Sequence, residues 1–203
     1  VVIGGDGFRT EISQYNPLIM FGESQYGNMR RSIAGGVDMG SIWDNRIRSA
    51  FASANQPNGI FNTPMELWEN PIYVDSVKLF GPNEEWDSKI GARLFMMMND
   101  GVWMCNNAYG SGFNPDKPSN DNIRWFKISG TTGVHQLQVT ADGNSLFVGR
   151  TNGSIFRIDG LNTADFDTTK LVAYNAISSD LTTTNISGNL NIGGRTVTGI
   201  ATD

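Results

Sequence analysis

The stretch that decides the fold is VHQLQVTADGNSLFVGRTNGSIFRI, residues 134–158. Its first part, residues 134–139, alternates apolar and polar side chains, which is typical of a strand with one buried face. The polar residues 140–144 then predict a turn, and two further strands are expected at 145–150 and 154–158. Three short antiparallel strands joined by tight turns are therefore expected here.

The same pattern, in which a polar turn with glycine joins two short apolar strands, recurs along the chain. It is found at residues 94–104, at 18–32 and, in short form, at 1–9. Residues 170–174 are a candidate fourth strand of the unit above, and 195–201 resemble the first strand of another unit. Repeated units of four antiparallel strands are typical of β-propeller blades. The sequence therefore predicts an all-β fold: a β-propeller, or part of one, built of four-stranded antiparallel blades with long loop insertions.

Glycine sets the backbone requirements of these units. The pairs Asp100-Gly101 and Asn152-Gly153 predict type I′ turns, in which both central residues need positive φ angles. Gly149 lies inside a predicted strand, where the missing side chain permits another layer to approach closely.

The composition is that of a folded, acidic protein. The chain has 203 residues, of which 39% are hydrophobic, and a formal net charge of −5 at pH 7. The apolar content excludes a disordered acidic segment, and the lack of a basic surplus argues against nucleic acid as a partner. No apolar run is long enough to span a membrane. Cys105 and His135 are the single cysteine and histidine, so we expect no disulfide within the chain, no metal and no cofactor.

Irregular segments separate the predicted strands. Residues 37–92 contain four prolines and are expected to form a long insertion, within which 46–54 are compatible with a short helix. Residues 107–122 are rich in Asn, Gly, Pro and Ser and predict a loop. Residues 178–194 are expected to form a loop or a weak edge hairpin.

Aromatic residues in the 37–92 insertion are the candidate ligand-binding residues. Trp68, Tyr73 and Trp86 are the three that we single out, and Phe61 and Phe80 accompany them. Aromatic side chains carried on loops are what protein and carbohydrate ligands commonly contact. A small core beneath the loop explains the same residues, because long loops often pack on themselves.

Four segments resemble blades of the sortilin/Vps10-type and BNR-type propellers. They are VIGGDGFRTEIS at 2–13, FGESQYGNMRRSIAGG at 21–36, LFMMMNDGVWM at 94–104 and VTADGNSLFVGRTNGSIFRIDGL at 139–161. The nearest resemblance is to large secreted or cell-surface proteins of Bacteroidetes, of the kind exported by type IX secretion. The Asp box of that family is degenerate here, with Ala34 at the position of the Asp. The resemblance implies a non-enzymatic extracellular propeller module that binds a protein or a glycan within a larger protein.

A glycoside hydrolase of the propeller type is the alternative function, in a sialidase-like or a xyloglucanase-like form. Sialidase chemistry needs clustered arginines and a Tyr-Glu pair, and the residues nearest to that requirement are Arg9, Glu23, Tyr26, Arg30 and Arg31. A structural interpretation is favoured, because neighbouring strand residues point to opposite faces of a sheet.

A xyloglucanase-like enzyme needs two carboxylates that face each other across the substrate. Asp6 and Asp100 are the candidates at predicted hairpin tips. Because Asp before Gly is also a preferred turn pair, the conformation alone explains both residues.

The chain begins with VVIGG, which has neither an initiator Met nor a signal peptide and is typical of the middle of a strand. We therefore expect residues 1–203 to be blades of a larger ring, whose remaining blades would be a partner of this chain. The alternative is a complete four- or five-bladed ring in which 194–201 pairs with 1–9. The room needed by the 37–92 insertion favours the larger ring.

Overall fold

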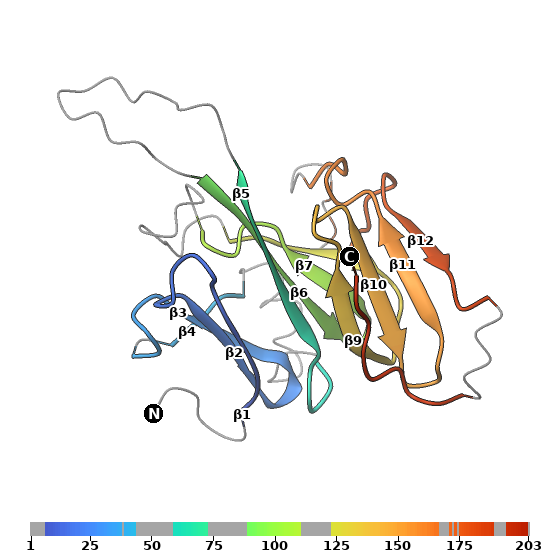
Figure 1. Cartoon of the computed structure of the whole chain (residues 1–203), viewed down its shortest axis with the longest axis horizontal. Helices are drawn as coiled ribbons and strands as arrows, with labels where there is room; N and C mark the ends of the chain where they lie inside the picture. The colour runs from blue at the N-terminus through green and yellow to red at the C-terminus, as the bar shows by residue number, and fades with distance from the viewer. Residues whose placement is uncertain are drawn as a thin grey trace.

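The chain is all-β where the structure describes it (Figure 1). This structure is a computed structural model, and it describes residues 7–37, 39–43, 59–72, 89–110, 123–166, 171, 173, 175–188 and 194–202. These residues form three four-stranded antiparallel sheets, each built of strands that follow one another in the sequence. Among them no helix is long and apolar enough to cross a membrane.

The three sheets share one up-and-down topology. The first sheet contains β1 (Gly7–Ile12), β2 (Met20–Ser24), β3 (Asn28–Ser32) and β4 (Gly40–Ser41). The second contains β5 (Met65–Ile72), β6 (Lys89–Met98), β7 (Gly101–Cys105) and β8 (Trp125–Ser129). The third contains β9 (Val134–Val139), β10 (Ser145–Arg150), β11 (Ile155–Asp159) and β12 (Thr182–Asn185). A single 3₁₀ turn, Gln25–Gly27, joins β2 to β3.

The second sheet lies between the other two and contributes to two separate cores. Met96 and Met98 of β6 are buried against the first sheet, where they meet Phe21 of β2. Met97, between them, points to the other face and is buried against the third sheet, where Leu146 of β10 lies. Side chains alternate between the faces of a strand, so a run of three methionines supplies both cores at once.

The first strands of the three sheets lie beside one another. β5 contacts β1 of the first sheet and β9 of the third (Figure 1). Each sheet then extends outward from this inner strand, through its second and third strands to a short edge strand. The described residues thus form three sheets stacked face to face around a shared inner edge, and they do not close into a ring.

The expected hairpins at 94–104 and 145–158 are confirmed as β6–β7 and β10–β11. Their expected turn type is wrong. Asn152 does not have a positive φ, whereas Gly153 has a φ of 84°. The Gly153 N–H donates to the Arg150 carbonyl at 3.2 Å, which closes a type I turn that ends in a left-handed glycine. A three-residue loop of this kind matches the strand twist with a single residue at positive φ.

The fourth strand of the third sheet is β12 (Thr182–Asn185), an edge strand within residues 178–194, which are expected to form a loop or a weak edge hairpin. Of the candidate strand 170–174, residues 171 and 173 are described and are not in a strand, and the other three lie outside the described residues. Residues 195–201 form no strand, although the Val197 N–H donates to the Arg150 carbonyl at 3.1 Å. The 194–202 segment instead lies along β10 (Figure 1).

Gly149 explains how the 194–202 segment lies so close to β10. A Cβ atom on Gly149 would lie 2.5 Å from the Val197 side chain, which is closer than real contacts allow. The close approach expected for this glycine is therefore present, and the layer that approaches is this segment.

The expected insertion at 37–92 is partly strand. β4, β5 and the first residues of β6 lie within it, so the insertion contributes strands to the first and second sheets. The candidate helix at 46–54, the first residues 1–6, and 111–122 of the predicted loop lie outside the described residues.

Candidate functional site

A pocket of about 370 Å³ opens where the second sheet meets the turns of the third sheet. β5 and β6 supply one wall, and the β9–β10 turn and the residues after β11 supply the other. Five of the eight lining residues have polar side chains; the eight are Trp68, Asn70, Gly91, Ala92, Arg93, Asn106, Asp142 and Asn162. A concave site with several polar groups and one aromatic wall is suited to a small polar ligand.

Arg93 ties the two walls together. Its Nη1 donates to the Gly143 carbonyl at 3.0 Å and to Oδ1 of Asn162 at 2.7 Å, both on the third-sheet side. Its Nε donates to Oδ1 of Asn106 at 3.2 Å on the second-sheet side. Burial lowers the pKa of Arg93 from its usual value. The guanidinium is thus fixed in place by three hydrogen bonds from two of its three nitrogens.

Trp68 forms a buried wall of the pocket. It lies in β5 with 8% of its surface exposed, and its indole N–H donates to the Ala141 carbonyl at 3.0 Å. The Arg93 guanidinium lies 5.0 Å from the centre of the ring. Gly143, at a φ of +72°, lies so close to the same ring that a Cβ atom there would come within 2.4 Å of it.

Trp68 is expected on a loop of the insertion, whereas it lies in the strand β5. Of the two interpretations of that residue, packing in a core is the one that the structure supports. Trp68 nevertheless lines the pocket. The other two candidate binding residues, Tyr73 and Trp86, lie outside the described residues.

Asp142 supplies a carboxylate at the pocket. Its Oδ1 accepts hydrogen bonds from Thr140 Oγ1 at 2.6 Å and from the Asn144 N–H at 3.0 Å. These hydrogen bonds hold the pKa of Asp142 below its usual value, so the group is ionised near neutral pH. Among the described residues no donor reaches its Oδ2.

A second polar cluster lies along the inner strands. Glu11 of β1 and Glu66 of β5 repel each other and share the positive charge of Arg9. Burial, followed by the Glu11 charge, raises the pKa of Glu66 to about 7. Gln138 of β9 donates to Oε1 of Glu66 at 3.0 Å, which links the second sheet to the third.

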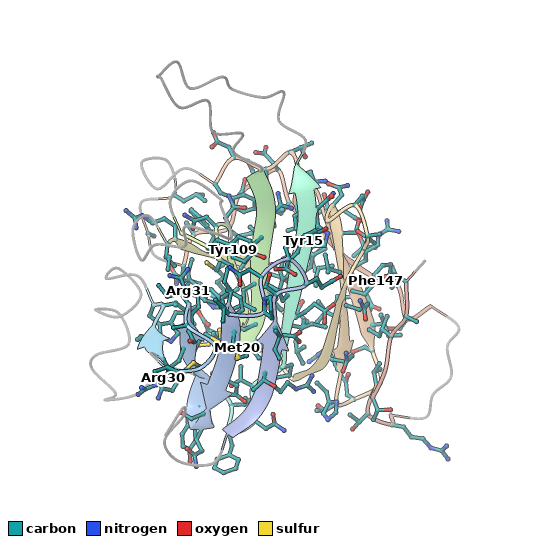
Figure 2. All side chains as sticks on the ribbon, turned by 60° about the vertical axis from the view of Figure 1, so that its left-hand side comes forward. Tyr15, Met20, Arg30, Arg31, Tyr109 and Phe147 are labelled. Atoms are coloured by element: carbon teal, nitrogen blue, oxygen red, sulfur yellow. The ribbon has the colours of Figure 1, made fainter. Side chains whose placement is uncertain are left out.

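Glu69 of β5 links the second sheet to the first. Burial raises its pKa, and the Gln14 N–H donates to its Oε2 at 2.8 Å. The Tyr109 hydroxyl donates to Oε1 of Glu69 and also contacts Ser13 Oγ at 2.7 Å. Figure 2 shows Tyr109 among the side chains packed between these sheets.

Glu23 of β2 is fully buried. Its Oε1 accepts the Thr63 N–H at 3.1 Å, whereas no donor among the described residues reaches its Oε2. Burial raises the pKa of Glu23 to about 7, and the Thr63 N–H, the Arg9 charge and the Gly27 backbone N–H oppose that rise.

The residues considered for sialidase chemistry are brought together only in part, since the Arg9 charge acts on Glu23. Arg31 is buried and donates to the Ala108 carbonyl at 2.7 Å, near Tyr109 (Figure 2). The side chain of its neighbour Arg30, whose partner in β2 is Gly22, points to the opposite face of the first sheet. Tyr26 lies in the exposed 3₁₀ turn with a φ of 65°.

The hairpin-tip carboxylates give no catalytic pair within the described residues. Asp100 accepts the Trp103 indole N–H at 2.9 Å and forms an ion pair with Lys127 at 3.0 Å. These contacts give it a structural role at the β6–β7 turn. Asp6 lies outside the described residues.

The described part of the chain contains no candidate metal site. No group of three His, Cys, Asp or Glu side chains is placed there to hold a metal ion. The Cys105 side chain is buried within the first core, where it packs as a small apolar residue.

The sequence singled out Trp68 of the pocket but missed Asn70, Arg93, Asn106 and Asn162. Four separate segments bring these polar residues together, so no local spacing could have marked them. Asp142 was recognised as a turn residue, which is correct. Comparison of the chain with models of known protein families, with curated proteins and with solved structures finds no match.

Proposed function

We propose that this chain is a non-enzymatic glycan-binding module of β-propeller type and that the pocket around Arg93 holds the sugar. The observation that carries the proposal is the gathering of five polar side chains, Asn70, Arg93, Asn106, Asp142 and Asn162, at one concave site. Sugar hydroxyls both donate and accept hydrogen bonds, so fixed amide, guanidinium and carboxylate groups suit them.

The arrangement of the sheets supports the propeller part of the proposal. Three four-stranded antiparallel sheets of consecutive strands, stacked around adjacent inner strands, are what neighbouring blades require. On the outer face of the first sheet, Ile12 is 51% exposed and pairs across to Met20. An apolar face of this kind suits a further blade as its neighbour, so we include the rest of a ring among the partners. The extracellular setting within a larger secreted or cell-surface protein rests on the resemblance to the sortilin/Vps10-type and BNR-type propellers.

The test is a glycan-binding measurement with the purified protein. A panel of plant and host oligosaccharides, followed by calorimetry on any hit, is expected to reveal a ligand. Asn70→Ala is expected to weaken binding at least threefold with little change in stability, because the Asn70 side chain makes no hydrogen bond with the described residues. Thr10→Ala, on the exposed outer face of the first sheet, is the matched control and keeps full affinity. Absence of binding to every glycan would refute the proposal.

A second candidate, a propeller-type glycoside hydrolase, is favoured by one observation. Glu66 has a pKa of about 7, which suits a general acid, and the Glu11 carboxylate lies near enough to help raise it. Two carboxylates with different pKa values are the pair that such hydrolysis uses. Hydrolysis of any glycan by the wild type that Glu66→Gln abolishes would support this candidate over the binding module.

A further inference from the structure

Some polar groups of the Arg93 pocket already have hydrogen-bond partners, and others do not. Within the described residues, the Arg93 guanidinium donates two hydrogen bonds from Nη1 and one from Nε. Recognition of a carboxylate by arginine normally uses two parallel N–H donors from adjacent nitrogens. Because Nη1 and Nε are occupied, Arg93 retains only Nη2 and cannot present this fork to an acidic ligand.

The carboxylate of Asp142 opposes an acidic ligand more directly. It lines the same pocket, and the hydrogen bonds from Thr140 and Asn144 occupy one oxygen only. The other oxygen can accept hydrogen bonds from ligand hydroxyls. An anion in the pocket would instead meet this negative charge at short range.

Stacking of a sugar on the pocket aromatic is also restricted. The Arg93 guanidinium lies 5.0 Å from the centre of the Trp68 ring, Gly143 packs against the same ring, and 8% of Trp68 is exposed. A ligand therefore has to be recognised through its hydroxyl edge rather than through its apolar face. The amides of Asn70 and Asn106 and the Nη2 group of Arg93 supply donors for this edge, and Asp142 supplies the acceptor.

We infer that the pocket selects neutral sugars with adjacent hydroxyl groups and rejects uronic and sialic acids, with Asp142 as the residue that determines this specificity. The inference rests on the proposed glycan-binding function and narrows it to one ligand class. A pair of neighbouring hydroxyls donates to the carboxylate, and the ring oxygens accept from the amide and guanidinium donors.

The experiment compares neutral oligosaccharides with uronate-containing and sialylated ones of similar size, by calorimetry at low and at physiological salt. For the wild type we expect neutral ligands to bind at least about tenfold more tightly than acidic ones, with a larger difference at low salt. Asp142→Asn removes the charge but retains a side-chain oxygen for Thr140 and Asn144. It is expected to reduce the preference by about tenfold, mainly by strengthening the binding of acidic ligands.

Asp165→Asn, at an exposed carboxylate that does not line the pocket, is the control for a change of net charge. It is expected to leave the preference unchanged. Tighter or equal binding of acidic sugars by the wild type would overturn this inference and leave the glycan-binding function in place. An unchanged preference in Asp142→Asn would also overturn it. Failure of every sugar to bind would refute the proposed function, and the inference with it.

Discussion

Glu23 makes the stability of this protein depend on pH in the direction opposite to that of most carboxylates. A carboxylate that is paired in the folded state stabilises it above the unfolded pKa. Glu23 is fully buried, its Oε2 has no donor among the described residues, and its pKa rises from 4.5 to about 7. The folded protein therefore holds this proton more tightly than the unfolded chain does.

The magnitude follows from the shift in pKa. Each pKa unit corresponds to about 1.4 kcal/mol, so the rise at Glu23 from 4.5 to about 7 is equivalent to about 3 kcal/mol. The contribution of protonated Glu23 to the free energy of unfolding is fully present below pH 4.5, declines as the pH rises, and is lost above about pH 7. The free energy of unfolding is expected to be larger at pH 5 than at pH 8.

The perturbation is Glu23→Gln, which removes the charge and keeps an oxygen for the Thr63 N–H. The new amide N–H₂ group, if it lacks an acceptor, costs about 1–3 kcal/mol at every pH. The free energy of unfolding of the variant at a single pH therefore does not report the Glu23 proton. The change in the free energy of unfolding between pH 5 and pH 8 reports it directly. We expect this difference to shrink by about 2.5 kcal/mol relative to wild type, because part of the contribution is already lost at pH 5.

The assay is urea unfolding followed by tryptophan fluorescence, at half-unit steps from pH 5 to pH 8. Some pH dependence is expected to remain in Glu23→Gln, because the pKa of Glu66 is also raised to about 7. Asp165→Asn, at an exposed carboxyl, should give a profile parallel to that of the wild type. A Glu23→Gln profile parallel to the wild type would refute the reasoning, since it would mean that the buried carboxyl does not titrate in this range.

Three further substitutions test the close contacts of the fold. Gly143→Ala should destabilise the protein by about 2–4 kcal/mol, because the residue has a positive φ and its new Cβ would lie 2.4 Å from an indole ring. Chemical unfolding measures this loss, and Gly130→Ala is the control, because a Cβ at Gly130 meets nothing within 4 Å. Gly149→Ala should displace the 194–202 segment, so limited proteolysis is expected to cut there faster while the sheets survive; unchanged cleavage would contradict the contact. Asp100→Ala should cost about 1–3 kcal/mol in unfolding experiments, through its lost indole and lysine contacts, and should leave glycan binding intact.

The strands that the sequence predicts correctly are those with a local signal. The hairpins at 94–104 and 145–158 combine alternating apolar residues with a polar turn that contains glycine. For β12 (Thr182–Asn185) the sequence leaves a loop and a weak edge hairpin open, because all four residues are exposed and polar and show no alternation. Its place in the sheet comes from pairing with β11, which is a tertiary contact.

The polar sites could be predicted far less well. The Arg93 pocket assembles from β5, β6 and three later loops, which no sequence spacing relates. Glu23 lies in a run that is correctly recognised as a strand, but the sequence does not show that the segment before β5 contacts its carboxylate through the Thr63 N–H. Trp68 was identified as notable for its residue type, whereas its burial depends on how β5 packs against the third sheet.

The position of the second sheet between two cores also bears on how the protein tolerates mutation. Each sheet forms from consecutive strands, so the assembly behaves as a row of three units in which each unit is stabilised by its immediate neighbours. A defect in an outer unit weakens one interface, whereas a defect at Met96 or Met97 weakens the unit through which the other two are held. Residues of β6 should therefore accept fewer substitutions during evolution than residues of β3 or β11, even where burial is equal.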